Sequence, residues 1–213
     1  MTKQKDTDVT GRYGLSRRSQ VKILILGLLG LVAGCAASES ERQAGQLQAL
    51  APAEARLIFN HPSLAEPATF DRFVSDNEKY TEETAYWTPT LDKRAEAGLL
   101  LSESQAGPPL ADPKDPAVTY DFWPPFREKT PAFGRLIESS NDRGPLLWRR
   151  ASVGTATCVL FVQHWEQLAP QGSPSPQATL SGYYCNPPGV TMSGEAAEAI
   201  LGSVRLRAAG NPQ

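Results

Sequence analysis

The clearest pattern of apolar and polar positions lies in the last third of the chain. Three segments there are rich in branched and aromatic side chains, Leu147–Val153, Thr157–His164 and Ala178–Cys185, and Gly154 separates the first two. Such segments, bounded by turn residues, are typical of β-strands. Residues 167–177 contain three prolines and a glycine, so we expect a loop between the second and third strands.

Capping residues and apolar periodicity predict two helices. Thr130 followed by Pro131 is typical of a helix start, and apolar residues then recur at three- and four-residue spacing until the turn residues 141–145. Ser193 precedes a second run with the same spacing, which predicts a capped helix near the C-terminus. Residues 204–207 are expected to end this region as a short strand.

The preceding part of the chain is less regular. Residues 54–101 mix short apolar pieces with turn residues, and residues 102–131 contain seven prolines, which favours loops or polyproline-like chain. All 18 prolines follow Cys35, and this argues against long uninterrupted helices. The pattern as a whole predicts a single α+β domain with an antiparallel sheet, a few short helices and long proline-rich loops.

The N-terminal residues have the pattern of an export signal. Residues 1–22 carry six basic and two acidic side chains, and residues 23–33 then contain no charged or polar side chain. Eleven apolar residues are too few for a membrane-spanning helix, which needs about 20, but they fit the apolar region of a secretory signal. A buried core helix is the alternative. No other segment is apolar for as long, so we expect no other part of the chain to span a membrane.

The residues Val32-Ala33-Gly34-Cys35 follow directly, where a branched apolar residue and two small residues precede a cysteine. This motif resembles the lipobox of bacterial lipoproteins, and the resemblance covers about the first 35 residues. It implies that residues 1–34 are removed as a signal peptide and that Cys35 becomes the lipidated first residue, carrying fatty acids such as palmitate. Two or three acyl chains hold a protein on a membrane essentially permanently, whereas one binds only marginally.

The same resemblance implies a location. Ala36 rather than Asp follows the cysteine, which in a Gram-negative cell implies the outer membrane rather than the inner membrane. The expected site is therefore the periplasmic face of the cell envelope. Residues 16–22, which contain Arg17 and Arg18, resemble a twin-arginine export signal, although Gln20 stands where that signal has a large apolar residue. General secretion with two incidental arginines is the alternative.

Composition divides the chain after its signal. Residues 36–49 are small, polar and rich in Gln, so residues 35–51 are predicted to be the lipidated cysteine and a flexible tether, and residues 52–213 the periplasmic domain. Because 6 of the 21 basic but only 2 of the 23 acidic residues precede Cys35, the remaining chain has a formal charge of −6. An acidic chain without a long basic run argues against nucleic acid as a partner.

The cysteine count predicts a disulfide. With Cys35 lipidated, Cys158 and Cys185 remain, and thiols in an oxidising envelope are expected to bond. If the strands that contain them pair antiparallel with the cysteines opposed, Leu160 faces Tyr183 and His164 faces Thr179. Every partner then falls within the other strand, at a separation that a disulfide accepts. The alternative is a buried pair without a bond.

Signatures of catalysis and of cofactor binding are absent from the sequence. There is no nucleophile elbow, phosphate loop, dinucleotide fingerprint or paired-cysteine metal motif, so we expect no cofactor and no metal. His164 with Glu166, at a strand end, is a candidate general base, although a histidine there is more often structural or on the surface. His61, next to a proline, is interpreted as a turn residue.

Aromatic and basic residues suggest weaker binding candidates. Trp123, Trp148 and Trp165 are candidates for stacking on a glycan or peptidoglycan strand, with core packing as the alternative. Arg150 is a candidate contact for an anionic partner. In an alternating strand it shares a face with Trp148. As the alternative, one of the two arginines at positions 149 and 150 stacks on an aromatic ring. The preferred interpretation is a lipid-anchored envelope protein that binds or scaffolds another envelope protein or a glycan. A small periplasmic hydrolase or transferase using His164 is the alternative.

Overall fold

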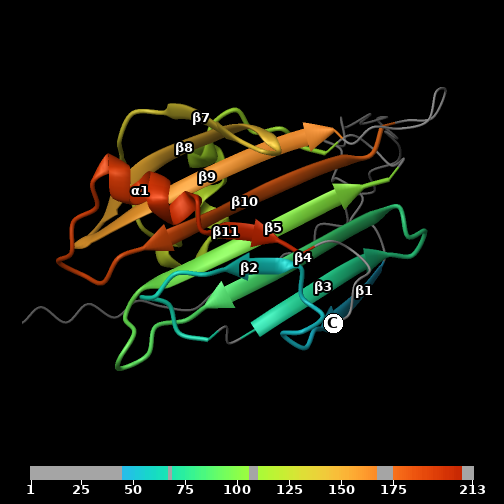
Figure 1. Ribbon diagram of the computed structural model, residues 1–213, viewed down its shortest axis with the longest axis horizontal. Coiled ribbons are helices and arrows are strands. Elements are labelled where there is room, and N and C mark those ends of the chain that lie inside the picture. The colour runs from blue at the N-terminus through green and yellow to red at the C-terminus, as the bar shows by residue number, and fades with distance from the viewer. Residues whose placement is uncertain (1–44, 67–68, 106–109, 167–174, 208–213) are drawn as a thin grey trace, which may run out of the picture. The chain divides into compact units, whose positions relative to one another are not determined.

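The computed structural model describes residues 45–66, 69–105, 110–166 and 175–207, which all belong to one compact unit spanning residues 42–213 (Figure 1). The predicted signal, the lipobox and Cys35 lie outside the described residues, as do residues 167–174 of the predicted loop.

Within the described part of the chain, nine antiparallel strands form the main sheet in the order β1-β3-β4-β5-β10-β9-β8, and both β6 and β7 pair with the far edge of β8. Their bounds are β1 Gly45–Ala49, β3 Thr69–Ser75, β4 Tyr80–Trp87, β5 Glu96–Ser104, β6 Ala132–Phe133, β7 Ile137–Asn141, β8 Gly144–Val153, β9 Ala156–Glu166 and β10 Gln177–Cys185. The three strands predicted from apolar patterning are thus confirmed as β8, β9 and β10.

The remaining elements are short. A second sheet contains β2 (Leu57–Phe59) and β11 (Val204–Leu206). The helix α1 (Gly194–Leu201) begins after Ser193, whose side chain accepts a hydrogen bond from the backbone N–H of Ala196 at 3.0 Å. The C-terminal helix and the short strand after it are therefore confirmed. Two 3-10 helices, η1 (Pro116–Phe122) and η2 (Pro124–Phe126), lie in the proline-rich region.

The two faces of the main sheet are covered to different extents. Because side chains alternate along a strand, the register assigns each residue to one face. The face that carries Leu99, Phe161 and Leu180, here called the covered face, packs against β2, β11 and α1 in one large buried cluster. Figure 1 shows these elements lying over the strands. The opposite face, here called the open face, carries Ser102 and Thr179 on neighbouring strands.

A short segment covers one end of the open face. Residues 116–126, which form η1 and η2 and are here called the strap, bury Trp123 and Phe126 in a second cluster with Cys158, Leu160 and Tyr183. Gly98 makes this contact possible, because a Cβ atom there would lie 2.6 Å from the Tyr183 ring and 3.1 Å from the Trp123 ring. The strap therefore closes on the sheet only where β5 has no side chain.

The helix predicted after Thr130 is wrong, because this segment forms β6 and β7 and pairs with β8. Phe133 lies opposite Ala151, and Ile137 lies opposite Trp148. Of the apolar residues that repeat at helical spacing, Phe133 and Ile137 instead pack in the clusters on opposite faces of the sheet, and Leu136 is exposed. Pairing with β8 therefore outweighs the local helical pattern.

The boundary predicted between the tether and the domain, after residue 51, lies too far along the chain. Residues 45–49 form β1 and pair antiparallel with β3, so the folded domain begins before Pro52. All five residues of β1 are exposed, which explains why apolar patterning does not reveal the strand. With six further strands between residues 57 and 141 that the sequence pattern did not predict, the domain contains more strand and less helix than an even α+β mixture.

Candidate binding surface

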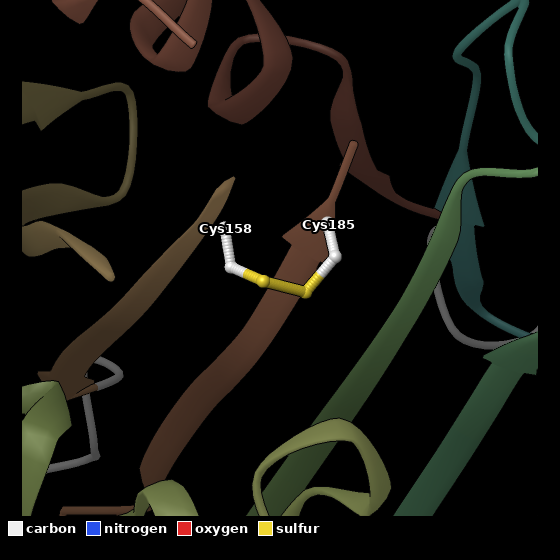
Figure 2. Close-up of a disulfide and its surroundings, with 2 residues drawn as sticks. All are labelled: Cys158 and Cys185. Carbon is white, nitrogen blue, oxygen red and sulfur yellow. A yellow bond between two sulfur atoms is a disulfide. The ribbon is translucent and has the colours of Figure 1, made fainter. Parts of the chain in front are cut away.

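The disulfide predicted from the cysteine count is present at the strap-covered end of the open face (Figure 2). Cys158 on β9 and Cys185 on β10 are directly opposed, with their Cα atoms 4.0 Å apart and a bond between their sulfur atoms. The predicted register is also confirmed, since Leu160 faces Tyr183 and His164 faces Thr179. The bond joins two central strands beneath the strap.

Ionic and aromatic contacts hold the strap in place. The Asp115 carboxylate accepts a hydrogen bond from the backbone N–H of Ala117 at 2.8 Å and pairs with the Arg149 guanidinium at 2.9 Å. The Trp123 ring lies 5.2 Å from the Tyr183 ring, between centroids. Burial, and secondarily the nearby Glu96 carboxylate, raises the pKa of Tyr183 far above its usual value. The strap is thus part of the packed core.

Beyond the strap, the open face is not covered by a second layer of strands or helices among the described residues. The cross-strand register aligns one row of side chains across six neighbouring strands. This row contains Leu47, Phe73, Glu82, Ser102, Thr179 and His164, from β1 to β9. It brings together an aliphatic group, an aromatic ring, a carboxylate, two hydroxyls and an imidazole.

Hydrogen bonds connect the acidic part of this row. The Glu82 carboxylate accepts hydrogen bonds from the Tyr80 hydroxyl and, at 3.4 Å, from the Ser102 hydroxyl. The Tyr80 ring packs edge-on against Phe73, with 6.3 Å between centroids. Burial is the main cause that raises the pKa of Tyr80, and the hydrogen bond and negative charge of Glu82 raise it further. The phenol therefore stays protonated at neutral pH and can act as a hydrogen-bond donor.

At the other end of the row, His164 is paired with a hydroxyl. Its Nδ1 atom lies 2.9 Å from Thr179 Oγ1, and that hydroxyl donates to the backbone carbonyl of Ala111 at 3.3 Å. Because the single hydroxyl proton of Thr179 is directed to Ala111, we assign the Nδ1 proton to His164, and Nε2 is then a hydrogen-bond acceptor. The pair with Glu166 suggested by the sequence is not formed among the described residues, because no ion pair joins these side chains.

The structure places the tryptophan candidates elsewhere. Trp123 and Trp148 are each only 1% exposed, so the prediction that they form a surface for glycan stacking is wrong. Both pack in buried clusters, Trp123 beneath the strap and Trp148 on the covered face. Trp165 is half-buried against the covered-face cluster. Core packing, the alternative considered for these residues, explains all three positions.

The two arginines on β8 point to opposite faces, as the strand pattern predicted. Arg150 lies on the same face as Trp148 and donates to the backbone carbonyl of Met192 at 2.8 Å. Arg149 lies over the Phe133 ring at 5.4 Å in addition to pairing with Asp115. The arginine that stacks on an aromatic ring is thus Arg149, and Arg150 ties the segment before α1 to the sheet.

The covered face contains a charged network that the sequence pattern did not reveal. The buried Glu83 carboxylate accepts hydrogen bonds from the backbone N–H groups of Arg56 and Leu57, at 2.5 and 3.0 Å, and pairs with Arg72 at 2.9 Å. The Arg56 guanidinium forms two hydrogen bonds with Glu103. These contacts hold the start of β2 against β4 and β5, so their role is structural.

His61 also belongs to the covered face. Its ring lies 4.9 Å from the Tyr184 ring, and its Nδ1 atom accepts a hydrogen bond from the backbone N–H of Ser63 at 3.4 Å. Burial lowers the pKa of His61 below its usual value. The turn position predicted for this residue is confirmed, since the backbone N–H of Leu64 donates to the His61 carbonyl at 3.1 Å in a turn shortly after β2.

Among the described residues, no three or more His, Cys, Asp or Glu side chains are arranged to hold a metal ion. No helix in the same part of the chain has the length and apolar character needed to cross a membrane. No known family, no curated protein and no solved structure is significantly similar to this chain.

Proposed function

We propose that this chain is a lipid-anchored cell-envelope protein whose sheet domain binds or scaffolds a partner through the part of its open face that the strap leaves free. The observation that carries this proposal is the asymmetry of the main sheet. The covered face is buried under β2, β11 and α1, whereas over the row from Leu47 to His164 the described residues place no strand or helix, and only the chain at Ala111 contacts the row, at the buried Thr179.

The chemistry of this row suits a polar partner. Tyr80 and Ser102 present hydroxyl groups around the Glu82 carboxylate, and Phe73 supplies an aromatic edge. His164 adds an imidazole acceptor at the far end of the row. Convergent hydrogen-bonding groups beside a modest apolar area are typical of a recognition surface.

The lipobox and the position of β1 together support a location close to a membrane. About ten residues separate Cys35 from Gly45, and an extended chain of that length spans at most about 34 Å. A lipid on Cys35 would therefore hold the domain within roughly one domain diameter of the membrane. The disulfide between Cys158 and Cys185 suits the oxidising compartment that this location implies.

Anchoring is tested by feeding cells a labelled fatty acid. We expect the label on the wild-type chain and none on the Cys35→Ser variant, because only the thiol accepts the diacylglyceryl group. Equal labelling of the two chains, or no labelling of either, would refute the lipid anchor.

The binding surface is tested by photo-crosslinking in cells. A photoreactive amino acid at Ser102 lies within the row, and the same amino acid at Glu198 lies on the exposed side of α1 as a matched control. We expect a discrete adduct from position 102 that position 198 does not form. The same adducts from both positions would contradict a binding role for the open face.

A further inference from the structure

The free edge of the main sheet is suited to pair with a second copy of this chain. At the other end of the sheet the outer strands are β6 and β7, which both pair with β8, and β7 carries a charged residue, Glu138, of the kind that protects a sheet edge. Among the residues that the structure describes, strand β1 pairs only with β3, and all five of its residues are exposed. Its sequence, GQLQA, contains no charged residue and no proline, the residues with which proteins commonly protect a sheet edge.

The hydrogen-bond pattern shows which backbone groups of β1 are directed outward. The backbone N–H of Leu50 donates to the carbonyl of Phe70 at 2.8 Å, so residues in phase with Leu50 along the strand bond to β3. In an antiparallel pair the bonded residues alternate, and the N–H and C=O groups of Gly45, Leu47 and Ala49 therefore point away from β3. Leu47 is also 73% exposed.

We propose that two copies of the chain pair edge to edge through β1, antiparallel and centred on Leu47. In this register Leu47 faces Leu47 of the second copy, and Gly45 faces Ala49, so that all the outward-directed backbone groups of the strand find partners. A two-fold axis through such a pair is the simplest self-complementary arrangement.

The side chains of β1 fit this symmetric register. Gln46 would face Gln48 across the axis on one side of the sheet, and side-chain amides can hydrogen-bond to each other. On the other side, the two Leu47 side chains meet on the axis, and the Phe73 ring of each chain lies against its own Gly45. No like charges oppose each other in this pairing.

Membrane anchoring, which is itself proposed above, would strengthen the contact. Five residues per chain are few compared with the roughly 20 to 30 of a stable dimer, so the pair is expected to be weak in dilute solution. Confinement to one membrane raises the effective concentration of the second copy. Each Gly45 lies two residues from the axis, so the two copies of Gly45 would be about 14 Å apart, which lets both lipids reach the same membrane.

Disulfide crosslinking of the full-length chain in membranes tests this register. Cys158 and Cys185 are already bonded, so the introduced thiol is identifiable by peptide mapping. Leu47→Cys places two thiols on the axis, whereas in Ala49→Cys the two thiols are about 14 Å apart, beyond the Cα separation of about 7 Å that a disulfide tolerates. We expect at least a tenfold greater yield of disulfide-linked dimer from Leu47→Cys.

A second arm uses the flanking glutamines. Two differently tagged chains, one with Gln46→Cys and the other with Gln48→Cys, are co-expressed and should form a mixed disulfide. Adding Leu47→Lys to both chains should reduce the yield of this disulfide several-fold, because it places like charges on the axis. Leu47→Lys should leave the melting temperature unchanged, because this side chain is exposed. The proposal is overturned by equal crosslinking at positions 47 and 49, by no dimer from Leu47→Cys, or by an adduct with a different protein. Labelling with the fatty acid tests the lipid anchor independently of crosslinking. A chain that carries no lipid and a chain that does not dimerise can therefore be told apart.

Discussion

The two faces of the main sheet differ in what holds their side chains in place. On the covered face, Glu83 and Gln163 are buried and engaged in hydrogen bonds, Glu83 with the chain before and at β2 and Gln163 with the β7–β8 hairpin. On the open face, Glu82 and Ser102 are only half-buried and bond mainly to each other and to Tyr80. The difference indicates that substitutions on the covered face should change stability, whereas those on the open face should change binding.

The largest expected change in stability is at Glu83, and the adjacent carboxylate on β4, Glu82, is its control. Replacing Glu83 by Leu leaves Arg72 and two backbone N–H groups without their partner, and we expect a loss of about 3 to 5 kcal/mol in unfolding free energy. Glu82→Leu, on the open face, should cost less than about 1 kcal/mol. Urea denaturation measures both variants. Similar losses would remove the distinction between the faces.

Removal of the disulfide tests the strap-covered end of the open face. The bond closes a segment with a sequence separation of 27 residues, for which chain entropy predicts a stabilisation of about 3 to 4 kcal/mol. We expect the double variant Cys158→Ala, Cys185→Ala to lose this amount in denaturant unfolding. Non-reducing peptide mapping of the wild type should recover the linked peptides, and two freely alkylated thiols would contradict the bond.

An intermediate effect is expected at Gln163 on the covered face. Its amide donates to Asn141 at 2.7 Å and to the Gly144 carbonyl at 3.0 Å, which ties the β7–β8 hairpin to β9. Gln163→Leu leaves these groups unpaired and should cost about 2 kcal/mol by thermal unfolding. Ser181→Ala, a half-buried change on the open face, should cost less than about 0.5 kcal/mol. A larger loss at Ser181 than at Gln163 would reverse the comparison.

The smallest effect concerns pH on the covered face. Burial lowers the pKa of His61, so at acidic pH the unfolded chain binds a proton that the folded chain does not. The contribution of His61 to stability is therefore fully present above pH 6.5 and is lost as the pH falls through its lowered pKa. We expect the melting temperature to fall less between pH 7.5 and pH 5 in His61→Gln than in the wild type. Parallel pH profiles would show that His61 does not contribute.

The strands around the disulfide were predictable because several local signals agree. Apolar segments bounded by Gly154 indicate strands, and the cysteine pair allows one register in which every partner falls within the opposite strand. The C-terminal helix is equally local, since Ser193 caps a short apolar repeat. In these elements the tertiary structure and the local preferences coincide.

Elsewhere the local signal and the tertiary structure disagree. The residues after Thr130 repeat at helical spacing, yet the edge of β8 draws them into strand pairing. Strand β1 has no apolar pattern at all, because backbone pairing with β3 holds the strand in place while its side chains stay in solvent. Propensity is a weak guide wherever a sheet edge offers hydrogen-bond partners.

The candidate surface could not be assembled from the sequence. Of its residues, the sequence indicates only His164 as a candidate for binding or catalysis, because histidine has recognisable chemistry. Leu47, Phe73 and Ser102 belong to no motif and lie far apart in the chain. Trp123 and Trp148 were singled out as aromatic but are buried. No local pattern shows that Gly98 admits the strap or which face a tryptophan will take.

The sequence by itself determined the cysteine pairing and the strands of the C-terminal half, because each depends on residues that are close together or covalently constrained. The tertiary structure alone decided which face of the sheet is covered, which edge stays free and which side chains form a row across six strands. These properties depend on the pairing of distant segments, and many sequences with the same local pattern could pair differently.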